Sequence, residues 1–308
     1  MKINTEFIAV LINSTIRMTS PILLATLAAA LCSKVKLFNI ALEGAMISGA
    51  FFSILANDYT GSVWVSILAG SLGGLAVCAI VGLLVIQFNA SEVVAGLIAN
   101  TLMTASTTYL LYLFFNTKGV YTSLDLVDLP KVSLPLINRL PILGTILSNL
   151  TILDYFAYFS AVGIYIFLYK TIVGFRLRAV GINKEAAKSL GTPVNRYQFL
   201  TISLSGLLCG LGGCLLSMGT VTLFIEGITS GRGYIALAAN AVGQSHPLGV
   251  LLSCAFFGAT QALGNVLQNT DLKTQITSSI PYLSTILVLI VYSIYMKWKN
   301  NRTRNVGN

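Results

Sequence analysis

The chain has 308 residues, of which 55% are hydrophobic and only 9% are charged, and its formal net charge is +9. A soluble domain carries about 25% charged residues because its surface must be wetted, so this composition excludes a soluble globular protein. Apolar runs of about 20 residues, the length that crosses a hydrocarbon core, recur along the sequence. They predict an all-α polytopic membrane protein that forms a single transmembrane domain over residues 1–308.

Eight apolar runs predict membrane-spanning helices. In chain order they are 7–31, 37–57, 62–86, 90–115, 150–172, 199–221, 247–268 and 280–297. A further apolar piece, residues 233–245, is too short to cross the membrane as a straight helix. Such a piece is tolerated at membrane depth only where it is buried in protein or lines a cavity. We therefore expect a partial or re-entrant element there.

The distribution of Lys and Arg predicts the orientation, because these residues gather in loops that stay in the cytoplasm. When the basic C-terminal tail is placed in the cytoplasm, the segments on that side hold twelve Lys and Arg residues and the opposite segments hold six. The N-terminus then lies outside, residues 116–149 form an outer loop and residues 173–198 form a basic cytoplasmic loop. The same bias explains the net charge, so we expect contact with the lipid bilayer and none with nucleic acid. The outer loop is either a passive lid or a docking surface for an outer partner.

Arg17, Glu43 and Glu92 are the candidate ionisable residues at membrane depth, where each is energetically expensive. One interpretation is that the two carboxylates reach the interface from helix ends and that Arg17 pairs with another helix. The alternative is a polar translocation pathway through the bundle. Its candidate residues are Asn39, Glu43, Asn100, Glu226 and Arg232.

Several chemistries are missing from the sequence. There is no GxxxxGK[ST], HExxH or GxSxG motif, and the five cysteines have no CxxC spacing. His246, the single histidine, precedes Pro247 at a predicted turn. We therefore expect no catalytic residue, no metal site and no cofactor on this chain, which favours a transporter or a channel over an enzyme.

The segment GINKEAAKSLGTPVNRY, residues 181–197, is polar and lies between two apolar runs. Asn183 is a good N-cap, and the residues after it are strong helix formers. Gly191 suits the left-handed position after a helix, and Pro193 prevents continuation. The pattern predicts a short capped helix over 184–190, either a solvated loop helix or a rigid knob that enters a groove on another protein.

The same segment carries a family resemblance. RLRAVGINKEAAKSLG, residues 176–191, resembles the EAA-type coupling loop of ABC-importer permeases of the branched-chain amino acid, simple sugar and nucleoside group. FNIALEGAMISGAFF at 38–52, LPLINRLPILGTIL at 134–147 and residues 230–263 resemble that group in the same order, closest to its nucleoside and simple-sugar members. GQSHP at 243–247 departs from the group, in which an aromatic residue typically precedes Asn-Pro.

The resemblance implies a transporter with several subunits in a bacterial cytoplasmic membrane. Two permeases, often non-identical, would form the pore, two cytoplasmic ABC ATPases would bind ATP, and an outer substrate-binding lipoprotein would deliver the solute. The ATPase-coupling residues would be Arg178, Gly181, Glu185, Ala186, Ala187 and Gly191. The expected solutes are nucleosides or related ribosyl compounds. The alternatives are a simple-sugar or riboflavin-type ABC permease, an ion-coupled secondary transporter and a membrane scaffold.

Overall fold

The computed structural model describes residues 5–132 and 141–268, together with residues 283–287, 290, 294 and 297. Its elements in chain order are α1 (Thr5–Ser33), α2 (Leu42–Thr60), α3 (Val63–Ile86), α4 (Glu92–Phe115), β1 (Val120–Tyr121), α5 (Pro141–Leu147), α6 (Ile152–Lys170), α7 (Ile172–Ile182), α8 (Lys184–Ser189), α9 (Val194–Cys214), the π-helix η1 (Leu215–Thr220), β2 (Phe224–Ile225), α10 (Arg232–Val242) and α11 (Pro247–Gln268).

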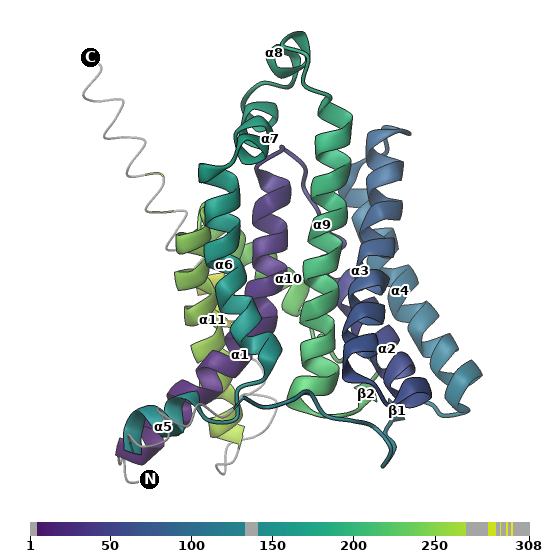
Figure 1. Ribbon diagram of the computed structural model, residues 1–308, viewed down its shortest axis with the longest axis vertical. Coiled ribbons are helices and arrows are strands. Elements are labelled where there is room, and N and C mark those ends of the chain that lie inside the picture. Colours follow the sequence, from purple (N-terminus) through teal and green to yellow (C-terminus); the bar gives the residue numbers. More distant parts are fainter. Residues whose placement is uncertain are drawn as a thin grey trace.

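The long helices run side by side along one axis, with α8 beyond one end of the bundle and β1 and β2 at the other (Figure 1). We call these the α8 end and the β end. Among the described residues, six helical segments are long and apolar enough to cross a membrane: α1, α3, α4, α6, α9 with η1, and α11. They coincide with six of the predicted spans. The second half of α1 lies at the centre, where residues 22–32 are all buried.

The predicted span 37–57 differs from the structure at its start. The helix begins only at Leu42, and the buried chain before it is not helical. Side chains take the place of the missing helical hydrogen bonds: the Asn39 amide oxygen accepts from Ala41 N–H at 3.0 Å, and the Asn100 amide donates to the Ile40 carbonyl at 3.0 Å. A non-helical backbone at membrane depth needs such internal partners. The helix α2 is largely buried and packs against α3, α9 and α4.

The short apolar piece at 233–245 forms α10, an 11-residue helix over Arg232–Val242. At 1.5 Å per residue it is roughly 16 Å long, about half of a hydrocarbon core. It packs against α1 and α11 and is held within the protein. The expected short element is therefore confirmed as a helix.

Glycines allow α3 and α9 to pack closely, as their spacing of four residues predicts. A Cβ added to Gly74 would lie 2.4 Å from the Gly206 carbonyl oxygen, and one added to Gly210 would lie 2.4 Å from the Gly70 carbonyl oxygen. The two backbones are thus in direct contact at these positions.

One expectation about the fold needs a correction, and another concerns residues that the structure mostly does not describe. The all-α prediction missed a small antiparallel sheet in which Val120 pairs with Ile225 and Tyr121 with Phe224. Two-residue strands more than 100 residues apart leave no alternation pattern to detect. Most of the predicted span 280–297 lies outside the described residues. Within this span, residues 283–287 are described and are helical.

Candidate functional site

The helix α8 has the caps that the sequence predicts. The Asn183 side-chain oxygen accepts from the backbone N–H groups of Glu185 and Ala186 at 3.0 and 3.1 Å. Gly191 has a φ of 78°, in the left-handed region. Both ends of this six-residue helix are therefore fixed by local chemistry, and α8 projects from the end of the bundle as a defined knob (Figure 1).

The predicted coupling residues divide into exposed and internal positions. Glu185, Ala186 and Gly191 are exposed. Ala187 is only 4% exposed and packs into the core, which differs from the expectation that both alanines face a partner. Consecutive residues of a helix point in directions about 100° apart, so Ala187 packs on its own chain while Ala186 stays exposed.

Gly181 and Arg178 also serve this chain's own packing. A Cβ on Gly181 would lie 2.0 Å from the Lys34 carbonyl oxygen, so only glycine lets α7 approach the segment after α1. The Arg178 guanidinium lies over the Tyr169 ring at 4.7 Å, and Tyr169 is in turn next to His246. Burial and the nearby Arg178 charge lower the pKa of Lys34. The contact with Tyr169 shows that His246 is a turn residue packed against aromatic rings.

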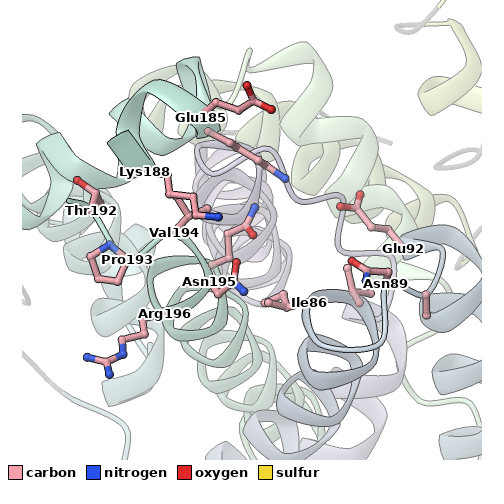
Figure 2. Close-up of a pocket in the computed structure, with 14 residues that line it drawn as sticks. Ile86, Asn89, Glu92, Glu185, Lys188, Thr192, Pro193, Val194, Asn195 and Arg196 are labelled. Carbon is pink, nitrogen blue, oxygen red and sulfur yellow. The ribbon is translucent and has the colours of Figure 1, made fainter. Parts of the chain in front are cut away.

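A cavity of about 720 Å³ lies beside α8, between that helix and the turn joining α3 to α4 (Figure 2). Lys184, Glu185 and Lys188 of α8 contribute to one wall, and Glu92 of α4 to another. The Glu92 carboxylate accepts from Phe38 N–H at 2.8 Å, which anchors it at the α8 end. The cavity beside α8 therefore carries both signs of charge.

A second cavity, of about 850 Å³, lies where α4 meets the start of α10, and we call it the α4–α10 cavity. Three of the five predicted pathway residues line it: Glu43, Asn100 and Glu226. Arg232 lines a neighbouring cavity of about 480 Å³ together with Arg17 and Glu226. The polar residues of distant segments are thus gathered in one region.

Glu43 holds the first turn of α10. Its carboxylate accepts from Gly231 N–H at 2.9 Å, from Gly233 N–H at 2.6 Å and from the Thr229 hydroxyl. The side chain is 7% exposed, so its carboxylate is held inside the protein. A carboxylate is favourable at a helix N-terminus, where unpaired N–H groups converge. Glu43 therefore joins the start of α2 to the start of α10 at the edge of the cavity.

The remaining pathway candidates have internal partners. Asn100 accepts from Gly44 N–H at 2.8 Å and donates to the Ile40 carbonyl and the Tyr234 hydroxyl. Asn39 is 3% exposed and donates to the Ser205 hydroxyl at 2.9 Å, away from the cavity. Arg232 donates to two backbone carbonyls within its own turn.

The sequence analysis missed most of the residues that line the cavity, among them three threonines and a tyrosine. Thr101, Thr104 and Thr108 line the cavity from α4, and Tyr234 lines it from α10. The threonines stand at positions i, i+3 and i+7 of α4, which places them on one face. That spacing was a detectable signal, whereas the position of Tyr234 depends on how α10 packs.

Comparison with known proteins gives a consistent result. Residues 11–294 match the family described as the permease component of the branched-chain amino acid transport system. The guanosine ABC transporter permease protein NupQ of Bacillus subtilis is 31% identical over 92% of both chains. The nucleoside ABC transporter permease protein NupC of Lactococcus lactis is 29% identical over 89% of both. A protein of Haloferax volcanii, TsgC13, named as a glucose ABC transporter permease, is 30% identical over 92% of both.

A solved structure described as an inward-facing ABC transporter of the metal-chelate type matches 90% of this chain and 84% of its own, with a TM-score of 0.54. Its sequence is 16% identical, so it supports the fold alone. The chain belongs to the family of branched-chain amino acid transport system permease components. It is a membrane-embedded permease subunit of an ABC transporter and not an enzyme.

Proposed function

We propose that this chain is the permease subunit of an ATP-driven importer for nucleosides or related ribosyl compounds. The two relatives named for guanosine and nucleosides support this solute class. The α4–α10 cavity supplies part of the translocation pathway. The chain lies in a bacterial cytoplasmic membrane with eight spans, α10 as a partial element, the N-terminus outside and the C-terminus inside, which places the α8 end in the cytoplasm.

The energy source is a separate subunit, because the sequence has no P-loop. ATP then binds to a cytoplasmic ABC ATPase, and this chain needs no cofactor of its own. A second permease, expected to be non-identical, completes the pore, and an outer lipoprotein delivers the solute. Closure of the ATPase pair moves α8 and switches access to the cavity as a rigid-body transition.

The observation that carries this proposal is the geometry of α8. A six-residue helix is unstable alone in water, yet this one is capped at its start by Asn183, ended by Gly191 and anchored through buried Ala187. It holds Glu185 and Ala186 exposed. A preorganised short helix with a small residue at its tip fits a groove on a partner.

The test is the retention of the ATPase by variants of α8. Glu185→Lys and Ala186→Trp should each lower ATPase co-purification and ATP-dependent uptake at least ten-fold, while the amount of permease in the membrane stays unchanged. Ser189→Ala, also an exposed change on α8, is the matched control and should retain both. Full ATPase binding and uptake by the Glu185→Lys and Ala186→Trp variants would disprove the docking role.

The second candidate is an ABC permease for simple sugars, favoured by the resemblance to the Haloferax protein. A riboflavin-type permease is the other alternative within this class. Competition of unlabelled nucleosides, sugars and riboflavin against labelled nucleoside uptake distinguishes them. Strong competition by nucleosides alone supports the first proposal.

A further inference from the structure

The threonine hydroxyl groups on the α4 wall of the cavity donate their hydrogens to backbone carbonyls of the same helix. Thr101 donates to the Leu97 carbonyl at 2.6 Å, Thr104 to the Asn100 carbonyl at 3.0 Å and Thr108 to the Thr104 carbonyl at 3.0 Å. A hydroxyl has one hydrogen to donate and two lone pairs that can accept. Toward the cavity these three side chains therefore present acceptors and not donors.

The charges at the cavity have one sign. Glu43 and the exposed Glu226 line it, and none of its described lining residues is a Lys, Arg or His. Arg17 and Arg232 belong to the neighbouring cavity, which shares Glu226. Like charges repel strongly where water is partly excluded. The α4–α10 cavity is therefore unfavourable for an anion.

Two tyrosines supply aromatic surface on opposite elements. Tyr109 of α4 is 65% exposed and Tyr234 of α10 is 45% exposed, and both line the cavity. The Tyr234 hydroxyl accepts from the Asn100 amide at 3.1 Å, so its own hydrogen remains to be donated. Tyrosine rings of this kind provide apolar area together with a polar tip.

We infer that the α4–α10 cavity selects uncharged, ring-bearing solutes that are rich in N–H and O–H donors, and that it rejects their phosphorylated forms. This inference rests on the proposed function and adds to it a selection step within the permease itself. A nucleoside fits this description, because its ribose hydroxyls and exocyclic amino groups donate to the threonine acceptors. A nucleoside monophosphate carries the charge that the two carboxylates oppose.

Threonine-to-valine variants test the acceptor wall, since valine keeps the shape and removes the oxygen. In vesicles containing the complete transporter, we expect Thr104→Val with Thr108→Val to lower uptake of a labelled purine ribonucleoside about five-fold, the size of one or two net hydrogen bonds. Uptake of the 2′,3′-dideoxy analogue, which lacks two donors, should fall less than two-fold. The ratio of the two uptake rates is the readout, and the outer binding protein is unchanged throughout.

Thr107→Val is the matched control. Thr107 lies on the same helix and donates to the Met103 carbonyl at 2.8 Å, but it is 2% exposed and does not line the cavity. This variant should leave the ratio unchanged. In the unaltered transporter, the nucleoside 5′-monophosphate should compete only weakly and should not be taken up, and Glu226→Lys should raise its competition several-fold.

The outcomes separate this inference from the proposed function. Uptake that depends on ATP, with a ratio unchanged by the double valine variant or with equal transport of the monophosphate, would overturn the inference alone. Absence of any ATP-dependent nucleoside uptake by the unaltered transporter would overturn the proposed function and the inference with it.

Discussion

At the scale of single residues, Glu43 joins two helix starts that are distant in the sequence. It connects α2 to the first turn of α10 through three accepted hydrogen bonds and is almost fully buried. Its sequence position beside a helix start indicated an ionisable residue at membrane depth, but the partners that it holds lie about 190 residues away. A single sequence contains no local signal for such a contact.

Replacement of Glu43 should destabilise the protein through unsatisfied backbone groups. Glu43→Ala leaves the N–H groups of Gly231 and Gly233 without their acceptor, and a lost hydrogen bond to a charged group costs about 2 kcal/mol. We expect a lower thermal unfolding midpoint in detergent and a smaller loss for Glu43→Gln, which keeps one acceptor oxygen. Asp125→Asn, an exposed change in a loop, should leave the midpoint unchanged. Equal midpoints for Glu43→Ala and the unaltered protein would refute the capping role.

At the scale of elements, the helices follow from the sequence and their interruptions do not. Apolar runs predicted the long helices to within a few residues, and the caps of α8 followed from Asn183, Gly191 and Pro193 because these signals are local. The late start of α2 depends on Asn100, 60 residues from the Ile40 carbonyl that it satisfies. The β1–β2 pair and the burial of Ala187 likewise depend on packing between distant segments.

The cap of α8 is open to a direct test. Asn183→Ala removes the acceptor for two N–H groups, a change that costs about 1 kcal/mol of helix stability. We expect faster hydrogen exchange in 184–189 and reduced ATP-dependent uptake, because a frayed α8 docks poorly. Asn183→Ser restores a capping oxygen and should recover most of both. Unaltered exchange in the alanine variant would show that packing alone holds α8.

The contact of α3 with α9 gives a prediction about the stability of the bundle. Gly74→Val places side-chain atoms against the Gly206 carbonyl and should separate the two helices, with a strong loss of folded protein in the membrane. Gly163→Val on α6 is the control, because a Cβ at that position meets nothing within 4 Å. Size-exclusion profiles in detergent compare the two variants, and similar monodisperse yields would contradict the close packing.

At the scale of the whole molecule, the two candidate regions lie in different parts of one helical bundle. The α8 knob and its adjacent cavity occupy one end, and the α4–α10 cavity forms where α2, α4 and α10 converge. The sequence predicted Glu43, Asn100 and Glu226 as pathway residues, and the fold brings them together. Asn39 was also predicted, but it serves the packing of the segment before α2. Thr101, Thr104 and Thr108 complete the cavity wall. Their spacing is visible in the sequence, but which face of α4 lines a cavity depends on how the helices pack.

The central claim is that this permease moves its solute with energy from ATP hydrolysed by another subunit. The most direct measurement is accumulation of a labelled nucleoside in proteoliposomes that contain the complete transporter, with ATP supplied on the ATPase side. We expect accumulation that requires ATP hydrolysis, persists when ion gradients are collapsed and is lost in Glu185→Lys. Accumulation that follows a proton or sodium gradient without ATP, or that survives Glu185→Lys unchanged, would contradict it.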